Sequence, residues 1–151
     1  MKITKKEHLE ALCIAVDNIV YCIDTQDNRC TAEPIFLVQE QKRIYGMDPE
    51  YSGQDTVWLD CLNDSEELTD AEAQVLEERY LETLEEPENF VRTGYIDQWE
   101  YVQPFFTEEA AQNYIDMNKH RHDELRIYVD SAYRNYEWQM IRALLLSMKK
   151  S

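Results

Sequence analysis

Glycine is scarce in this chain, and its scarcity excludes several kinds of site. Three glycines in 151 residues leave too little material for a glycine-rich loop that cradles phosphate groups. The nucleophile pattern G-x-S-x-G and the zinc-binding pattern H-E-x-x-H are also missing. We therefore expect no catalytic residue, no cofactor and no enzymatic activity.

Long apolar runs and closely paired cysteines are missing too. No stretch approaches about eighteen consecutive apolar residues, and the first residues lead into an amphipathic segment rather than a signal-peptide core. We therefore expect a cytoplasmic protein that contacts no membrane. The four cysteines lack the paired spacing of a zinc site, so we expect no metal and reduced thiols, with Cys13 and Cys22 buried in a helix.

Basic residues are greatly outnumbered. Fifteen Lys and Arg face 31 Asp and Glu, which gives a formal net charge of -16 at pH 7. Such a surface repels phosphates, so we expect no direct binding of nucleic acid. Ten Tyr, three Trp and four Phe nevertheless supply the large apolar side chains that a folded chain needs. The length and the lack of a linker or repeat predict a single domain over residues 1–151.

Helical periodicity predicts four helices, of which the first two begin with capping boxes. Thr4 with Glu7 starts the first helix, and Thr69 with Glu72 starts the second. Apolar side chains recur at helical spacing from Leu9 to Ile23, and we expect this stripe to pack against the rest of the chain. The four helices are expected over residues 5–23, 69–85, 107–118 and 135–149.

Runs of aromatic and β-branched residues predict four strands. These runs cover residues 35–45, 56–62, 95–106 and 125–130. With the helices, they give the order α-β-β-α-β-α-β-α. Consecutive strands and short crossovers favour an α+β fold, with a mixed or antiparallel sheet of about four strands that is covered by helices.

Negative charge is concentrated in an acidic segment at residues 60–88. This segment contains twelve carboxylates and one basic residue, Arg79, and therefore has a net charge of -11. Acidic residues three or four positions apart on a helix have Cβ atoms about 5–6 Å from each other, which approaches the spacing of successive backbone phosphates. A ridge of them could imitate a nucleic-acid strand. The candidate partner-binding residues are Asp64, Glu66, Glu67, Asp70, Glu78, Glu82, Glu85 and Glu86.

Three explanations of this segment remain open. A solvated face is the most common role of a charged run. A surface that attracts a basic protein or nucleoprotein complex is the second explanation. Calcium binding is the third, and the absence of a D-x-D-x-D-G loop disfavours it.

A second candidate site combines aromatic and arginine side chains. Strand periodicity places Tyr95 and Trp99 on one face of the third strand, and Arg126 and Tyr128 on one face of the fourth, with Arg134 just beyond. If these strands are neighbours, the five residues could stack on a base and contact a phosphate. The same residues are equally typical of a core in which Arg and Asp satisfy the polar ends of Tyr and Trp.

Four stretches of the sequence resemble a family of small accessory proteins of tailed phages and prophages. They are Gly94-Tyr-Ile-Asp-Gln-Trp-Glu100, Phe106-Thr-Glu-Glu, Arg126-Ile-Tyr-Val-Asp-Ser-Ala-Tyr-Arg134, and Ile35 to Tyr45 with the following Gly46 and Asp48-Pro49. The resemblance brings no activity and no site residues. It implies a nonessential phage gene of a class rich in inhibitors of host defences, many of which are acidic proteins that occupy nucleic-acid grooves.

The leading hypothesis is a phage-encoded viral protein that inhibits a host nucleic-acid-binding defence complex, of the anti-CRISPR or anti-restriction type. It would act in the host cytoplasm as a non-catalytic nucleic-acid mimic that binds a basic host protein through the acidic segment. One alternative is a sponge or hydrolase for a nucleotide second messenger that uses the aromatic and arginine residues. A further alternative is an oligomeric scaffold held together by the Leu9 to Ile23 helix.

Overall fold

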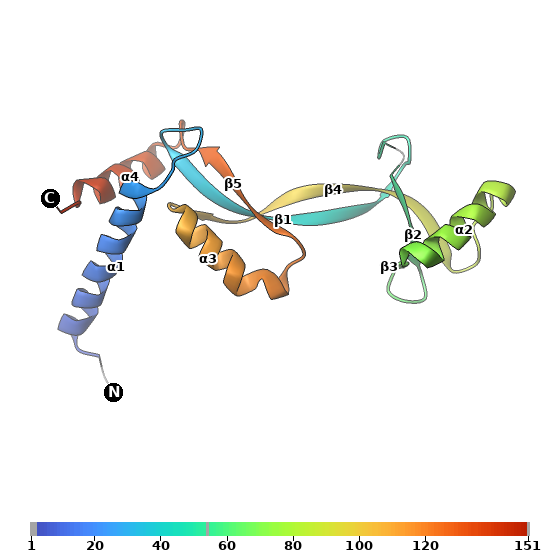
Figure 1. Cartoon of the computed structure of the whole chain (residues 1–151), viewed down its shortest axis with the longest axis horizontal. Helices are drawn as coiled ribbons and strands as arrows, with labels where there is room; N and C mark the ends of the chain where they lie inside the picture. The colour runs from blue at the N-terminus through green and yellow to red at the C-terminus, as the bar shows by residue number, and fades with distance from the viewer. Residues whose placement is uncertain (1–2, 54, 151) are drawn as a thin grey trace. The chain divides into compact units, whose positions relative to one another are not determined.

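The computed structural model describes residues 3–53 and 55–150 and has an α+β fold. Within these residues it contains four α-helices and five β-strands in the order α-β-β-β-α-β-α-β-α, so the predicted strand number of about four is corrected to five. The elements are α1 Lys5–Thr25, β1 Pro34–Met47, β2 Thr56–Asp60, β3 Glu66–Glu67, α2 Asp70–Thr83, β4 Phe90–Phe105, α3 Glu108–Asn118, β5 Leu125–Ser131 and α4 Tyr136–Ser147 (Figure 1).

The strands form one sheet in the order β3-β2-β4-β1-β5. The pairings of β1 with β5, of β2 with β3 and of β2 with β4 are antiparallel, in agreement with the predicted antiparallel alternative. Strand β4 begins five residues earlier than predicted because Phe90 to Gly94 pair with β2. The unpredicted strand β3 has two residues, and they pair with Leu59 and Asp60.

The chain divides into two compact units. The first unit comprises Met1–Gln41 and Trp99–Ser151, and the second comprises Lys42–Gln98. Strands β1 and β4 contribute residues to both units.

The core of the first unit lies between the sheet and α3. Phe36 and Val38 of β1 and Ala111 of α3 are completely buried. Thr107 caps α3 by accepting a hydrogen bond from the amide of Ala110, which fixes where this helix begins. Partly buried side chains complete the core: Val102, Phe105, Tyr114, Ile115, Leu125, Ile127 and Val129.

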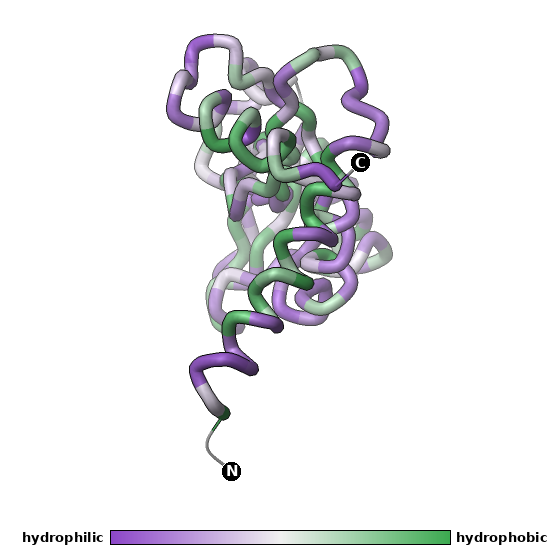
Figure 2. The backbone as a smooth tube through the Cα atoms, turned by 90° about the vertical axis from the view of Figure 1, so that its left-hand side faces the viewer, coloured by the Kyte–Doolittle hydropathy of each residue, from purple (hydrophilic) through white to green (hydrophobic). Residues whose placement is uncertain are grey.

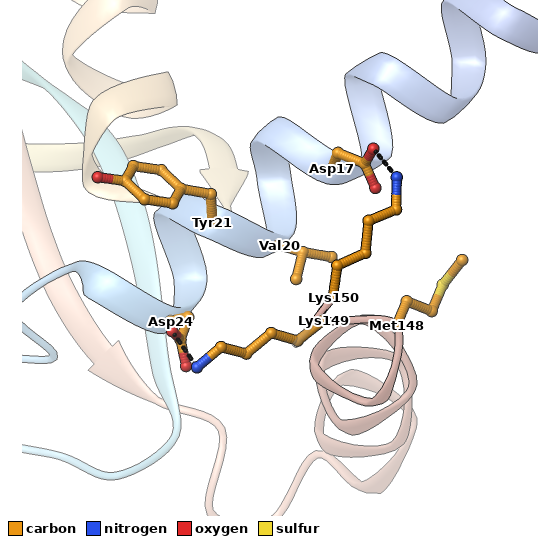
Figure 3. A pocket seen from close by; sticks show the side chains of 7 residues that line it. All are labelled: Asp17, Val20, Tyr21, Asp24, Met148, Lys149 and Lys150. Carbon is orange, nitrogen blue, oxygen red and sulfur yellow. Dashed lines mark hydrogen bonds and ion pairs between the residues drawn. The ribbon is translucent and has the colours of Figure 1, made fainter.

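Helices α1 and α4 pack together through the carboxyl-terminal half of α1. Val20 lines a cleft between the two helices, and two ion pairs lie beside it (Figure 3). Lys149 contacts Asp24 and Lys150 contacts Asp17, each at 2.7 Å. The remainder of the predicted α1 stripe does not pack against the chain, because residues 3–15 are all exposed.

In the second unit, α2 packs on β2 through aromatic side chains. The Trp58 ring is buried and meets Tyr80 edge to face, with 5.8 Å between the ring centroids. The predicted capping boxes at Thr4 and Thr69 are both present. Helix α2 ends at Thr83, earlier than predicted, because Leu84 adopts a left-handed conformation with φ 57°.

The four cysteines are free, as expected, but the prediction that Cys13 is buried is wrong. Cys13 lies on the exposed half of α1, and Cys22 is half-buried beside Glu109. The Cys22 thiol donates a hydrogen bond to this carboxylate, which raises the pKa of the thiol. No helix in the described part of the chain has the length and apolar character needed to cross a membrane.

A substitution at Gly94 tests how closely the second unit is packed. A Cβ atom at Gly94 would lie 2.5 Å from the Met47 carbonyl oxygen and 2.7 Å from Ser52 Oγ. We expect Gly94→Ala to lower the free energy of unfolding by about 1–3 kcal/mol through this overlap, measured by urea denaturation. At Gly46, where an added Cβ meets nothing within 4 Å, the same change should cost only the left-handed strain, about 1 kcal/mol. Equal losses at the two glycines would contradict the packing argument.

Candidate acidic surface

The structure places most of the negative charge in the second unit. Its 57 residues contain sixteen acidic and four basic residues, a formal charge of -12, and the first unit has the remaining -4. The predicted acidic segment at residues 60–88 lies entirely within the second unit. The charge is therefore as strongly localised in the fold as it is in the sequence.

Arg43 neutralises two carboxylates of the second unit. Its guanidinium contacts Asp97 at 2.7 Å and Glu67 at 3.0 Å, and it lies 3.9 Å from the centroid of the Tyr95 ring. The hydrogen bonds from Arg43 lower the pKa of Asp97, and the two carboxylates in turn raise the pKa of Arg43. The Tyr45 hydroxyl also donates to Glu67, at 2.7 Å. Desolvation and then this bond to Glu67 raise the pKa of Tyr45 to about 12.

Arg92 holds a third carboxylate, that of Glu77 on α2. Arg92 donates to both oxygens of Glu77, with an Nη2 to Oε1 distance of 2.8 Å. The indole nitrogen of Trp58 donates to the same carboxylate, also at 2.8 Å. These hydrogen bonds, led by those from Arg92, lower the pKa of Glu77. Through Glu77, α2 is therefore connected to β4 by Arg92 and to β2 by Trp58.

The other predicted partner-binding carboxylates are not neutralised in this way. Of the eight predicted residues, Glu67 is paired with Arg43. The remaining seven are exposed and form no ion pair with any lysine or arginine among residues 3–53 and 55–150. They are Asp64, Glu66, Asp70, Glu78, Glu82, Glu85 and Glu86.

The predicted helical ridge is shorter than expected. Glu78 and Glu82 lie one turn apart on α2 and are both exposed. Glu85 and Glu86 follow the left-handed Leu84 and so are not on the helix, which shortens the helix predicted to run to residue 85 and leaves these two carboxylates off its ridge. Glu86 instead accepts a hydrogen bond from the backbone amide of Arg92, at 3.2 Å.

An open groove between α2 and strands β2 and β3 adds a concave feature to this unit. It has a volume of about 300 Å³, and Glu67, Asp70 and Glu77 contribute carboxylates to its lining. Trp58 and Gln74 also line it. Glu77 was not among the predicted site residues, and only its long-range contacts reveal its place in the groove. Because Glu67 and Glu77 are already paired with Arg43 and Arg92, Asp70 is the one carboxylate of this lining without an ion pair to a lysine or arginine of the described chain.

The second candidate site, of aromatic and arginine residues, is only partly assembled. The guanidinium carbon of Arg126 lies 4.0 Å from the centroid of the Trp99 ring and 5.6 Å from that of Tyr128, and its Nε donates to Gln39 at 2.9 Å. These residues share the face of the sheet opposite the Phe36 core.

Tyr95 and Arg134 do not join this cluster. Tyr95 belongs to the second unit, where it stacks under Arg43. Arg134 lies at the junction of β5 and α4 and lines a separate cavity with Tyr133 and Tyr136. The cavities that we measured in the described chain are not lined by the Arg126 cluster. The five predicted residues are therefore divided between the two units, with Tyr95 in the second and the other four in the first.

No group of three or more His, Cys, Asp or Glu side chains suited to a metal ion occurs among the residues that the structure describes. Comparison with known proteins gave no matching family model, no matching curated protein and no matching solved structure. The assignment of a function therefore depends on the charge and geometry of this chain.

The Glu77 and Arg92 pair gives a testable pH dependence. The lowered pKa of Glu77 means that the pair stabilises the fold at pH values above the ordinary 4.5, and that this stability is lost as the pH falls through the lower folded-state value. We expect Glu77→Gln to cost about 1 kcal/mol at pH 7, since the carboxylate is partly exposed, and to cost less at pH 3 than at pH 7. Urea denaturation followed by tryptophan fluorescence measures both values.

Glu82→Gln is the matched control, because Glu82 is exposed on the same helix and forms no ion pair with a described lysine or arginine. It should change the free energy of unfolding by less than about 0.5 kcal/mol at either pH. A cost of Glu77→Gln that does not change between pH 7 and pH 3 would show that the ion pair is not its source.

Proposed function

We propose that this protein is a non-catalytic inhibitor that uses its second unit to occupy the basic nucleic-acid-binding surface of another protein. One observation carries the proposal: a unit of 57 residues has a formal charge of -12, and most of its carboxylates are exposed and not ion-paired within the described chain. Basic residues that could have neutralised them are almost absent from this unit.

The free energy of folding does not explain this arrangement. Like charges three or four residues apart, such as Glu78 and Glu82, destabilise a helix by a few tenths of a kcal/mol per pair. A net charge far from zero also opposes compaction through repulsion within the chain. An arrangement that reduces stability is understandable if these carboxylates act on a partner, where lysines and arginines replace the missing counter-charges.

The proposed target is a host defence complex that binds nucleic acid, such as a CRISPR effector or a restriction enzyme. Such complexes carry a positively charged channel, and phosphate-like carboxylates would compete with DNA or RNA for it. Electrostatic attraction would accelerate the encounter and make binding sensitive to salt. The resemblance of the sequence to phage accessory proteins supports a target in the host cytoplasm.

The nucleotide-messenger alternative draws less support from the arrangement of the residues. Trp99, Arg126 and Tyr128 lie on an open sheet face, whereas Tyr95 is occupied by Arg43 in the other unit. A small-molecule site is typically a concave pocket that buries most of its ligand.

A pair of charge-reversal variants tests the acidic surface. The double variant Glu78→Lys/Glu82→Lys changes two exposed carboxylates of α2 that form no described ion pair. We expect it to weaken binding to the inhibited complex by about tenfold or more at low salt, and to reduce the dependence of the affinity on salt. Affinity for a CRISPR effector complex and for a restriction enzyme is measured at several salt concentrations, together with inhibition of DNA cleavage.

The control is Glu100→Lys/Glu124→Lys, which makes the same change of net charge at exposed positions of the first unit. It should retain most of the affinity. The proposal fails if wild-type protein binds none of these complexes, if binding ignores salt, or if both double variants lose affinity equally.

A further inference from the structure

The amino-terminal half of α1 carries apolar side chains that no other element of the described chain covers. Every residue from Ile3 to Ala15 is exposed, and these turns lie away from the other elements of the first unit (Figure 1). Leu9 is 53% exposed, Leu12 48% and Ile14 63%. Hydrophobic residues recur along these turns (Figure 2). A helix of about a dozen residues is marginal in water by itself, so this segment lacks the packing that normally stabilises such a helix.

The spacing of the apolar residues matches that of a coiled coil. Leu9, Leu12, Val16, Ile19 and Ile23 follow one another at intervals of three, four, three and four residues. This alternation keeps one seam of the helix facing a partner helix. Ile23 is buried in the first unit, whereas Leu9, Leu12 and Ile19 are exposed. The carboxyl-terminal end of the seam is therefore buried in the first unit, whereas its amino-terminal part is not covered by any described residues.

Helix α4 also exposes apolar side chains. Ile141, Leu144 and Met148 are each at least 50% exposed. Met148 lines the same cleft as Val20 and Tyr21 of α1 (Figure 3). We call the exposed seam of α1 and these three side chains of α4, taken together, the α1–α4 face.

The charge of this face indicates which partner would cover it. Asp17 is the sole charged residue between Ala11 and Cys22, and it is already paired with Lys150. The positions beside the seam are His8, Cys13, Ala15, Val20 and Cys22, and none of them is Asp, Glu, Lys or Arg. At the folded end of the seam, Cys22 donates to the carboxylate of Glu109, and Asp24 is paired with Lys149 of the chain's carboxyl-terminal end. Two copies of a chain with a net charge of -16 would repel each other across most surfaces, but not across this one.

We propose that the α1–α4 face is the interface of a homodimer, in which the α1 seam of one copy packs against the α1 seam of the other about a twofold axis. A twofold contact joins the same patch on both subunits, so the patch must be self-complementary. An apolar seam without flanking charges meets this requirement, whereas a seam for a different protein commonly has charges beside it that select the partner. This proposal does not depend on the proposed function.

Sedimentation velocity of the full chain tests the proposal. We expect wild-type protein to sediment at twice its 18.0 kDa mass at about 100 µM and to dissociate on dilution. Leu12→Glu and Leu12→Lys place opposite charges in the seam, and both should weaken the dimer at least about tenfold. A loss with both variants excludes a simple effect of net charge. Circular dichroism of each variant checks that the fold is retained, and Leu9→Glu, at another exposed seam position, serves if either variant unfolds.

The matched control is Leu81→Glu, which adds the same charge at an apolar side chain of α2 that is 67% exposed. It should dimerise like the wild type. The proposal is overturned if wild-type protein remains at 18.0 kDa at about 100 µM, if folded Leu12 variants dimerise normally, or if Leu81→Glu dissociates as they do. A monomeric Leu12 variant that still binds the inhibited complex would separate this interface from the acidic surface.

Discussion

Repulsion between like charges opposes the folding of the second unit, and the ion pairs inside the unit offset it. This unit has four basic residues and sixteen acidic ones. Two of its arginines form ion pairs that connect elements of the unit. Arg92 joins α2 to the sheet through Glu77, and Arg43 joins β1 to β3 through Glu67. The arginines stabilise the fold and leave the outward carboxylates without counter-charges. Stability and the proposed binding activity therefore use different members of one acidic set.

The two units also differ in what they leave exposed. The second unit exposes carboxylates, whereas the first exposes the apolar α1–α4 face. An apolar face whose few charges are already paired suits a lasting contact between copies, and a face of unpaired charges suits a contact whose strength depends on salt. If both proposals hold, each dimer would present two acidic units. A target with two binding channels would then be bound more tightly than by a single copy.

Local signals allowed much of the fold to be predicted, and distant partners limited the rest. The capping boxes at Thr4 and Thr69 involve residues three positions apart, so the sequence alone reveals them. Strand β3 was missed because Glu66 and Glu67 have no apolar pattern, and only pairing with β2 makes them a strand. The Arg43 and Asp97 pair joins residues 54 positions apart, and no spacing rule predicts it.

The acidic site was predicted in composition but not in shape. The run of carboxylates lies within the more acidic unit of the fold, but the left-handed Leu84 ends the helix before Glu85. Strand β3, which contains only two glutamates, also lies at an edge of the sheet. Open sheet edges invite edge-to-edge addition of strands from other molecules, and short, charged edge strands discourage it. The acidity of this short edge strand therefore also discourages edge-to-edge aggregation, so that substitutions which neutralise Glu66 and Glu67 would lower solubility even if they left the proposed binding unchanged.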